Sequence, residues 1–305
     1  MIDDFGDLDK VHLAQMPDPR PETGEVLIQV AYAGVNPADW KMCEGRFKGR
    51  MPSAFPLIPG WDVAGHIKAV GAGVDAKRIG EAVYAYTRKP VMQWGSFAEL
   101  TTFEAQHVAT APKSLSMKQA AAIPLASLTA YQSVVEWGQV SKGQTVLIHA
   151  GAGGVGGMAI QFAHHHGARV ITTCSPRHNA YVKQLGADIV VDYTKEKVTD
   201  QVDLVFDTVG GSAVEDAFKI LRPGGRVVSI LDPTVEQTAP AHGFAGKYIF
   251  VRPEGNHLRE LARLFDTGAI QPPKVTEFPL EQASTALALL KEGHVEGKLV
   301  LKIGG

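Results

Sequence analysis

The chain has 305 residues, a length typical of about two domains. Its 30 Lys and Arg nearly balance 32 Asp and Glu, which argues against a nucleic-acid binder, and no apolar run is long enough to span a bilayer. The N-terminus lacks the basic and apolar regions of a signal peptide, and two cysteines, Cys43 and Cys174, exclude a disulfide framework. We therefore expect a cytoplasmic enzyme.

The first third of the chain has short, β-like periods punctuated by Gly and Pro. This pattern predicts a compact, barrel-like β domain. Its predicted strands are Val26–Val35, Asp62–Gly71, Glu81–Thr87, Gly95–Phe103 and His107–Ala111.

From Ser116 onward strands and helices alternate. Ser116 and Gln119 form a capping-box pattern that begins an Ala-rich helix reaching toward Glu136. The strands that follow are nearly all apolar, which predicts a parallel sheet covered on both faces. The predicted strands are Thr145–Ala150, Arg169–Ser175, Ile189–Tyr193, Val202–Val209, Arg226–Leu231 and Lys247–Val251, and the helices are Gly154–His166, Arg177–Leu185, Ser212–Leu221 and Pro253–Thr267.

The tail returns to the β-like pattern of the first segment. It predicts a strand at Val275–Leu280, a helix at Glu281–Glu292 and a strand at Lys298–Ile303. We therefore expect the tail to complete the first domain. This assigns residues 1–117 and 269–305 to the β domain and residues 118–268 to the α/β domain.

A glycine-rich segment, Gly151-Ala152-Gly153-Gly154-Val155-Gly156, matches the G-x-G-x-x-G pattern and lies between a predicted strand and a predicted helix. In that setting the first glycine permits a tight turn, the second lets a pyrophosphate approach the backbone, and the third permits close packing of helix on strand. The helix N-terminus adds N–H donors. The segment predicts a dinucleotide site in a Rossmann-type fold.

The choice of dinucleotide is expected to depend on the end of the next strand. An Asp or Glu there would bind the ribose hydroxyls of NAD. The chain instead has Ser175 and Arg177, which can hydrogen-bond and pair with a 2′-phosphate, and no acid before Asp188. An alternative is that Arg177 is only a solvated residue at a helix start. The pattern favours NADPH.

Several motifs, in a fixed order along nearly the whole chain, resemble those of the medium-chain dehydrogenase/reductase superfamily. They are Gly34–Trp40 (GVNPADW), Ile58–Gly65 (IPGWDVAG), Leu125–Tyr131 (LASLTAY), His149–Gly156, Asp207–Gly211 (DTVGG) and His294–Leu301 (HVEGKLVL). The pattern is similar to the zinc-independent quinone oxidoreductase and alkenal (enone) reductase branch, and Gly45–Lys48 is most similar to the alkenal reductases. The resemblance implies a GroES-like β-barrel catalytic domain joined to a Rossmann doubly wound parallel sheet, an α/β architecture with NADPH between the domains.

Zinc enzymes of this superfamily bind their catalytic metal through two Cys and one His. Here Asn36, Trp61 and Ala126 stand at those positions, and none of them supplies a thiolate or imidazole. The three consecutive histidines from His164 to His166 point in different directions on a helix and cannot converge on one ion. We therefore expect no metal site.

Without a Lewis acid, a conjugated acceptor is easier to reduce than an alcohol is to oxidise, because conjugation spreads the developing charge onto a distant oxygen. The expected activity is NADPH-dependent hydride transfer to a quinone or an α,β-unsaturated carbonyl. Two alternatives remain: a reductase of another activated double bond, of the enoyl thioester type, and an NADPH-binding protein with a non-catalytic role.

The resemblance implies that Asn36 lies at the nicotinamide and the substrate, although a turn-forming Asn before Pro37 is an alternative. Lys41 is a candidate donor of a proton or hydrogen bond, and a surface role is at least as good an explanation. Trp61 and Tyr86 are candidates for an apolar wall beside a flat substrate, and core packing explains them equally well. The catalytic candidates are thus Asn36, Lys41, Trp61 and Tyr86.

The candidate cofactor residues combine the glycine-rich segment with positions that the resemblance suggests. They are Asn36, Thr129, Gly151, Gly153, Gly154, Val155, Gly156, Ser175, Arg177, His178, Tyr193, Val209, Phe250 and Val251. The resemblance also implies a homodimer, because the last strand of the Rossmann sheet often pairs across a twofold axis in this family. We expect a small conjugated carbonyl or quinone as substrate and neither nucleic acid nor membrane as partner.

Overall fold

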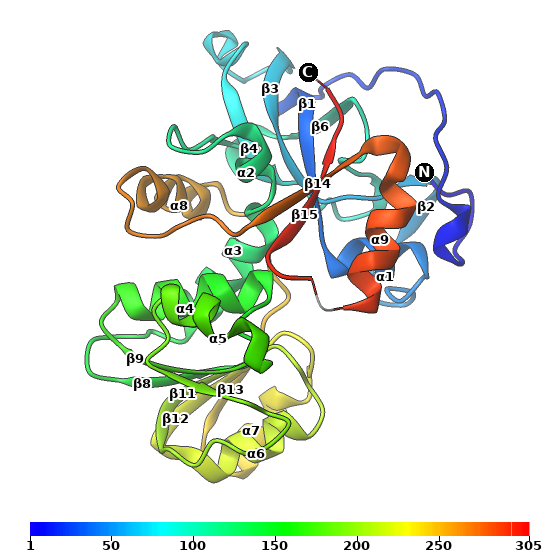
Figure 1. Cartoon of the computed structure of the whole chain (residues 1–305). Helices are drawn as coiled ribbons and strands as arrows, with labels where there is room; N and C mark the ends of the chain where they lie inside the picture. Colours follow the sequence, from blue (N-terminus) through cyan, green and yellow to red (C-terminus); the bar gives the residue numbers. More distant parts are fainter. Residues whose placement is uncertain (294, 305) are drawn as a thin grey trace. The chain divides into compact units, whose positions relative to one another are not determined.

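The computed structural model describes residues 1–293 and 295–304 and divides the chain into two compact units. Unit 1 comprises Met1–Leu125, Arg252–Gly268 and the chain from Pro272 onward. Unit 2 comprises Ala126–Val251 together with Ala269–Gln271. The colours of Figure 1 show that unit 1 combines the two ends of the chain, so it is discontinuous in sequence.

Unit 1 is built on a largely antiparallel sheet in which β1 is the longest strand. The strand order is β14-β15-β1-β3-β4-β7, and β6 also pairs with β1. The bounds are β1 Glu25–Val35, β3 Asp62–Val70, β4 Ala82–Tyr86, β6 Leu100–Glu104, β7 Ala109–Thr110, β14 Val275–Pro279 and β15 Lys298–Lys302. Because β15 runs antiparallel to β1, with Val35 opposite Leu299, the C-terminal segment completes this sheet, as expected.

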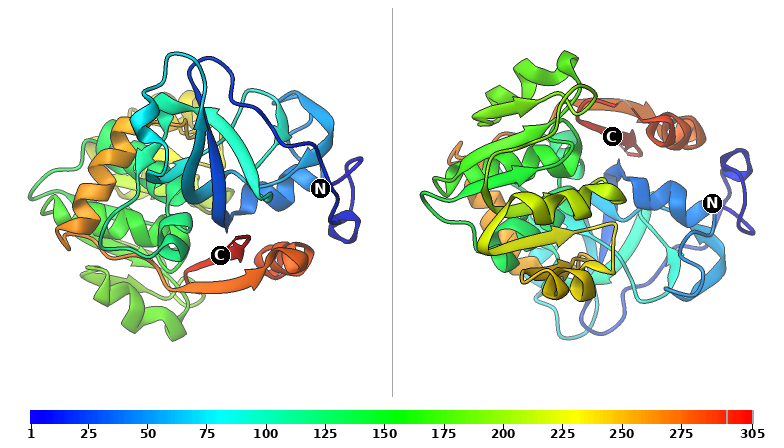
Figure 2. Two further views of the ribbon diagram at one scale, coloured as in Figure 1. Left: turned by 90° about the horizontal axis from the view of Figure 1, so that it is seen from above. Right: turned by 90° about the horizontal axis from the view of Figure 1, so that it is seen from below.

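Helices and a small second sheet surround these strands. They are α1 Pro37–Cys43, α2 Met117–Ala121, α8 Gly255–Asp266, α9 Ala283–Glu292, and the two-stranded pair of β2 Ser53–Ile58 and β5 Met92–Trp94. Figure 2 shows the orange strand β14 leading into α9. The N-terminus of α2 carries the predicted capping box, because Ser116 and Gln119 exchange backbone-to-side-chain hydrogen bonds.

The position of helix α8 differs from the one expected, because the expected domain division placed all residues up to 268 in the α/β domain. In the structure α8 belongs to unit 1. The Tyr84 hydroxyl donates a 2.5 Å hydrogen bond to the Leu258 carbonyl, and the Ser114 N–H donates a 2.8 Å bond to the Asp266 carboxylate. These bonds hold both the middle and the end of α8 against the β domain.

Unit 2 contains a six-stranded sheet in the order β10-β9-β8-β11-β12-β13, and all of its strand pairs are parallel. The strands are β8 Thr145–Ile148, β9 Arg169–Thr173, β10 Ile189–Val191, β11 Val202–Asp207, β12 Leu221–Ser229 and β13 Ala245–Tyr248. The helices are α3 Pro124–Ala130, which begins at the end of unit 1, α4 Gly154–His165, α5 Asn179–Gln184, α6 Ser212–Ile220 and α7 Val235–Ala241. A π-helical segment, Tyr131–Trp137, continues α3. Figure 1 shows α4 and α5 on one face of the sheet and α6 and α7 on the other.

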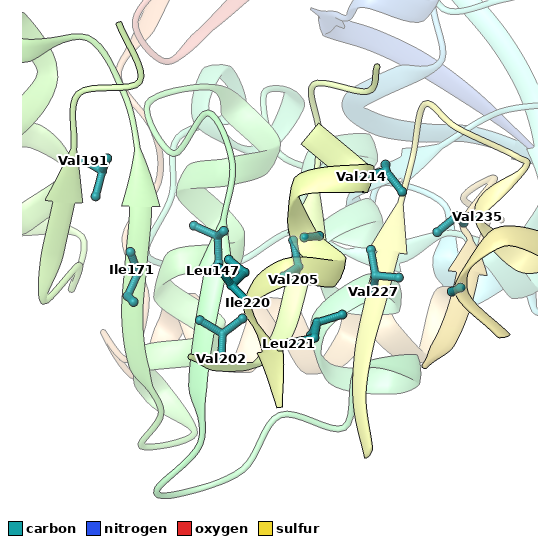
Figure 3. Close-up of a cluster of buried hydrophobic side chains, with 12 residues drawn as sticks. Leu147, Ile171, Val191, Val202, Val205, Val214, Ile220, Leu221, Val227 and Val235 are labelled. Atoms are coloured by element: carbon teal, nitrogen blue, oxygen red, sulfur yellow. The ribbon is translucent and has the colours of Figure 1, made fainter. Parts of the chain in front are cut away.

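The core of unit 2 is an apolar layer between the sheet and its helices. Figure 3 shows Leu147, Val205 and Val227, from three adjacent strands, facing Val214 and Ile220 of α6. Burial of these aliphatic side chains stabilises each strand by removing apolar surface from water. Residues on both faces of β8 are buried, which explains why its sequence is continuously apolar.

Among the described strands and α-helices, α1, β2, β5 and α7 were not predicted. Strand β2 contains Pro56, which the sequence pattern treats as a strand breaker, and α7 contains Pro240 near its end. Strand β5 has three residues, too few to establish a period. In the part of the chain that the structure describes, no helix combines the length and apolarity needed to traverse a bilayer.

Candidate functional site

The glycine-rich segment forms the turn between β8 and α4, as predicted. The Gly151 N–H donates a 3.0 Å hydrogen bond to the Thr173 carbonyl, which ties the turn to the neighbouring strand β9. A Cβ atom at Gly151 would lie 2.1 Å from Thr172 Oγ1, and one at Gly156 would lie 2.4 Å from the Ala150 carbonyl oxygen. Both glycines are therefore required for close packing within unit 2.

Gly153 has a different environment. The only nearby atom that a Cβ there would meet among the described residues is the Ala150 carbonyl oxygen, at 3.3 Å. Gly153 is the N-cap of α4, and residues 152 to 155 are partly exposed. The first turn of α4 carries no acidic side chain, and the first N–H groups of a helix lack intrahelical partners. The turn thus offers a bare backbone and a positive helix end, which fit a pyrophosphate.

The end of β9 carries no acid. Ser175 is the N-cap of the short 3-10 helix Pro176–His178, and Arg177 is exposed, with its Nε donating a 3.0 Å hydrogen bond to Nε2 of the buried His178. The first following acid, Asp188, accepts a 2.7 Å hydrogen bond from the Val170 N–H at the opposite end of β9. The residues at this position therefore fit a phosphate better than a neutral ribose hydroxyl.

The loop after β11 is held by a buried carboxylate. Asp207 accepts hydrogen bonds from the N–H groups of Val209 and Gly210 at 3.0 and 2.9 Å, and from Ser229 Oγ at 2.7 Å. His149 Nδ1 lies 3.3 Å from the same carboxylate. Burial alone would raise the pKa of Asp207, but these hydrogen bonds lower it below its usual value. Asp207 is therefore a fixed anion that shapes the loop.

The candidate cofactor residues of unit 2 gather along one edge of its sheet. Because the strands are parallel, their carboxyl ends share that edge. The candidates that follow these ends are Gly151, Gly153, Gly154, Val155, Gly156, Ser175, Arg177, His178, Tyr193, Val209, Phe250 and Val251. Tyr193 and Val209 are more than half exposed and Phe250 is 38% exposed, whereas Val251 is buried. Thr129 lies in α3 and is buried.

In unit 1 the structure reveals a buried polar cluster around Asn36. Asn36 follows β1 and is the N-cap of α1, and its backbone N–H donates a 2.7 Å hydrogen bond to Asp39 Oδ2. Its side-chain Nδ2 donates a 2.8 Å bond to Asp62 Oδ2, and its Oδ1 accepts a bond from Lys298 Nζ. Asn36, Asp39, Asp62 and Lys298 are each at most 5% exposed.

Burial dominates the electrostatics of this cluster. It raises the pKa of Asp39 to about 8, where Asp62 adds to the effect and the Asn36 N–H and Lys298 oppose it. Burial also raises the pKa of Asp62 to about 6, although the charge of Lys298 acts to lower it. Burial lowers the pKa of Lys298, although the carboxyl groups of Asp62 and Asp39 act to raise it. The protonated form is therefore favoured more strongly at Asp39 than at Asp62.

Trp61 and Tyr86 lie beside this cluster, because Tyr86 is paired with Asp62 between β4 and β3. Their rings meet edge to face at 6.0 Å, and Phe47 lies 5.8 Å from Trp61. Both side chains are buried, so the structure supports their packing role. Lys41, on α1, is partly buried and has its ammonium 5.5 Å from the centre of the Trp40 ring, and burial lowers its pKa. Among the described residues, no hydrogen bond joins Lys41 to Asn36.

The sequence reasoning missed Asp62 and Lys298 as members of the site. Both lie inside quoted motifs, but 236 positions separate them and nothing in one sequence indicates that they flank the same amide. The motif that contains Lys298 begins at His294, which lies outside the described residues. Within the described ranges, no three His, Cys, Asp or Glu side chains gather as metal ligands would.

Comparison with known proteins shows the family. Residues 22–113 match the alcohol dehydrogenase GroES-like domain, and residues 185–301 match the zinc-binding dehydrogenase model. The chain is 36% identical to the chloroplastic NADPH-dependent alkenal/one oxidoreductase of Arabidopsis thaliana, over 98% of this chain and 77% of that protein. Among solved structures, the quinone oxidoreductase from Coxiella burnetii aligns with a TM-score of 0.89 and 32% identity, over 99% of this chain and 98% of that one.

A mycobacterial protein solved in complex with NADPH aligns with a TM-score of 0.85 and 29% identity, over 99% of this chain and 98% of that chain. The order of the sequence motifs, the folds of the two units and the similarity to these proteins all indicate the same family. The chain belongs to the medium-chain dehydrogenase/reductase superfamily, in the group that contains the quinone oxidoreductases and the alkenal/one oxidoreductases.

Proposed function

We propose that the chain is an NADPH-dependent oxidoreductase that reduces a quinone or an α,β-unsaturated carbonyl. The observation that carries the proposal is the β8–α4 turn, where Gly153 leaves the backbone bare beside a helix N-terminus. The relatives named for alkenal/one and quinone reduction support the substrate class, and the neighbour bound to NADPH supports the cofactor.

In this proposal the residues of unit 2 hold the cofactor. Gly151, Gly153, Gly154, Val155 and Gly156 receive the pyrophosphate, and Ser175, Arg177, His178 and Tyr193 receive the adenosine phosphate. Thr129, Val209, Phe250 and Val251 are assigned to the nicotinamide end. When bound, NADPH supplies the hydride.

In unit 1, Asn36 is assigned to the acceptor oxygen. A quinone or enone develops negative charge on its oxygen as it is reduced, and an amide N–H stabilises that charge. Lys41, Trp61 and Tyr86 stay candidates for supporting roles. The burial of Trp61 and Tyr86 favours a role in shaping the wall behind Asn36 over direct chemistry.

The test measures binding and turnover separately. NADPH and NADH are titrated by fluorescence, and NADPH oxidation is then followed with a 1,2-quinone, a 1,4-quinone, an alkenal and an acrylyl thioester. We expect tighter binding of NADPH and turnover of a quinone or the alkenal. Preference for the thioester would favour the enoyl thioester alternative, whereas tight NADPH binding without turnover of any acceptor would contradict an enzymatic role.

We also propose a homodimer in a reducing, cytoplasmic environment. Strand β13 pairs with β12 and lies at the edge of its sheet, where a second copy can add strands. Both cysteines are free and buried, which agrees with a reducing compartment. Light scattering tests the assembly, since a mass equal to the 32.7 kDa chain would contradict the dimer.

A further inference from the structure

The side-chain amide of Asn36 is held from both ends by charged groups on two other strands. Lys298, the first residue of β15, donates from Nζ to Asn36 Oδ1 and, at 3.0 Å, to the Val35 carbonyl. Asp62, the first residue of β3, accepts a 2.8 Å hydrogen bond from Asn36 Nδ2. These two strands flank β1, so the three side chains converge where β1 ends.

This pair of bonds fixes which way the amide faces. A reversed amide would place its NH₂ group against the Lys298 ammonium and its oxygen against the Asp62 carboxylate, and both contacts would be repulsive. A primary amide has two N–H donors. Among the residues that the structure describes, Asp62 is the single hydrogen-bond acceptor of Nδ2, so one N–H is left for a ligand.

We infer that Lys298 is a positioning residue. It orients the Asn36 amide so that the remaining N–H of Nδ2 donates a hydrogen bond to the oxygen of the acceptor substrate. The inference rests on the proposed reductase function. The bond from the ammonium to Oδ1 also polarises the amide, which strengthens the remaining N–H in this buried setting. The arrangement selects acceptors that present a carbonyl or quinone oxygen, and it transmits a positive charge to that oxygen through Asn36.

A purely structural role for Lys298 is the competing explanation. Its bond to the Val35 carbonyl joins β15 to the end of β1, which would stabilise the sheet without affecting chemistry. The two explanations differ in a double-mutant cycle with Asn36. A residue that acts through Asn36 loses its effect when the amide is already gone, whereas an independent residue keeps it.

The first experiment measures kcat, KM and NADPH affinity for Lys298→Met, Asn36→Ala and the double variant. Lys302→Met, an exposed position on the same strand, is the matched control. We expect Lys298→Met to lower kcat by about 10- to 100-fold while NADPH affinity changes by less than about twofold, because the lost stabilisation belongs to the transition state. The double variant should lie within about threefold of Asn36→Ala. Losses that multiply in the double variant would overturn the inference.

The second experiment observes the amide itself and needs no turnover. In protein labelled with ¹⁵N-asparagine, the Asn36 side-chain signal is identified by its loss in Asn36→Ala. We expect slow hydrogen exchange of this NH₂ group in the wild type, and a changed shift with faster exchange in Lys298→Met. An Asn36 signal that Lys298→Met leaves unchanged would overturn the inference, even if the enzyme is active.

Removing Lys298 alone leaves Asp62 without its nearby cation, so that variant is at risk of unfolding. The double variant Lys298→Met/Asp62→Asn removes both charges, and Asp62→Asn alone is its reference, because Asp62 itself accepts from the Asn36 amide. The inference predicts that adding Lys298→Met to Asp62→Asn changes the Asn36 signal further, and an unchanged signal would overturn it. If the wild-type protein turns over no acceptor, the proposed function fails, while the amide spectrum still decides whether Lys298 orients Asn36.

Discussion

Asp39 accepts a 2.7 Å hydrogen bond from the backbone N–H of Asn36, three residues earlier in the chain, and both residues are buried. This bond closes the first turn of α1 and fixes the backbone from which the Asn36 amide projects. The carboxyl group of Asp39 therefore supports the backbone of the candidate site.

The raised pKa of Asp39 predicts a loss of stability with rising pH. The pKa is about 8 in the folded chain against 3.8 for a free Asp, so between these values the folded state keeps a proton that the unfolded state has released. The contribution of this group to the free energy of unfolding is fully present below about pH 4. It decreases as the pH rises from about 4 to about 8. Asp62, with a pKa of about 6, adds to the decline at the lower end of this range.

The variant Asp39→Asn should flatten this dependence, most clearly between pH 6 and 8. Urea unfolding at several pH values measures it, and the slope removed should not exceed about 1.4 kcal/mol per pH unit for one proton. Asp9→Asn, at an exposed position, is the control for loss of one charge. Parallel pH curves for the wild type and Asp39→Asn would show that Asp39 is ionised throughout.

Asp207→Asn should destabilise unit 2. An amide keeps one oxygen for the Val209 and Gly210 N–H groups, on the side that also faces His149, but turns its NH₂ group toward Ser229 Oγ, which donates to the other carboxylate oxygen. A buried donor left without an acceptor costs about 1–3 kcal/mol, which denaturant unfolding can measure. Asp200→Asn, in an exposed ion pair with Arg169, should change stability by less than about 0.5 kcal/mol.

Substitutions at two glycines of the β8–α4 turn should separate folding from cofactor binding. Gly153→Ala places a methyl group 3.3 Å from the Ala150 carbonyl oxygen, a contact that a small shift relieves, so we expect a folded protein. The methyl group occupies the surface assigned to the pyrophosphate, and NADPH affinity should fall by about tenfold or more.

Gly151→Ala should instead reduce stability. Its methyl group would lie 2.1 Å from Thr172 Oγ1 and 2.7 Å from Ile160 Cδ1, inside the packed layer of α4 on the sheet. Overpacking of this kind costs about 1–3 kcal/mol. Thermal unfolding and NADPH titration of both variants provide the test. Unchanged NADPH affinity in Gly153→Ala would contradict the assignment of the turn to the pyrophosphate.

Much of the fold was predictable, because its signals are local. The apolar strand, the glycine turn after it and the Ser116 capping box each lie within a few consecutive residues and were predicted. The strand was expected at residues 145–150 and ends two residues earlier, at Ile148. The pairing of the C-terminal strand with the first domain was predicted because the hydrophobic pattern of the tail returns to the short, β-like period of the first segment. By contrast, the position of α8 depends on contacts such as Tyr84 with Leu258, which join distant parts of the chain.

The candidate site was only partly predictable for the same reason. Asn36 was chosen as a candidate from its motif, but the charged groups that flank its amide are at positions 62 and 298. No local sequence pattern indicates that these two residues contact the same side chain. Trp61 and Tyr86 were suggested as a substrate wall because aromatic residues suit both surfaces and cores. Their burial depends on the register of β3 and β4, which sequence periodicity does not fix.

Arg177→Ala tests the expected preference for NADPH. Arg177 is exposed and hydrogen-bonded to His178 beside the end of β9, where it can pair with a 2′-phosphate that NADH lacks. We expect NADPH affinity to fall by about tenfold with little change for NADH, because a charge-assisted hydrogen bond contributes about 1.5–3 kcal/mol and part of it is screened at the surface. Arg169→Ala, at the other end of the same strand, is the control. The assignment would be wrong if Arg177→Ala weakened both cofactors equally, since that result would place Arg177 near a group that both share.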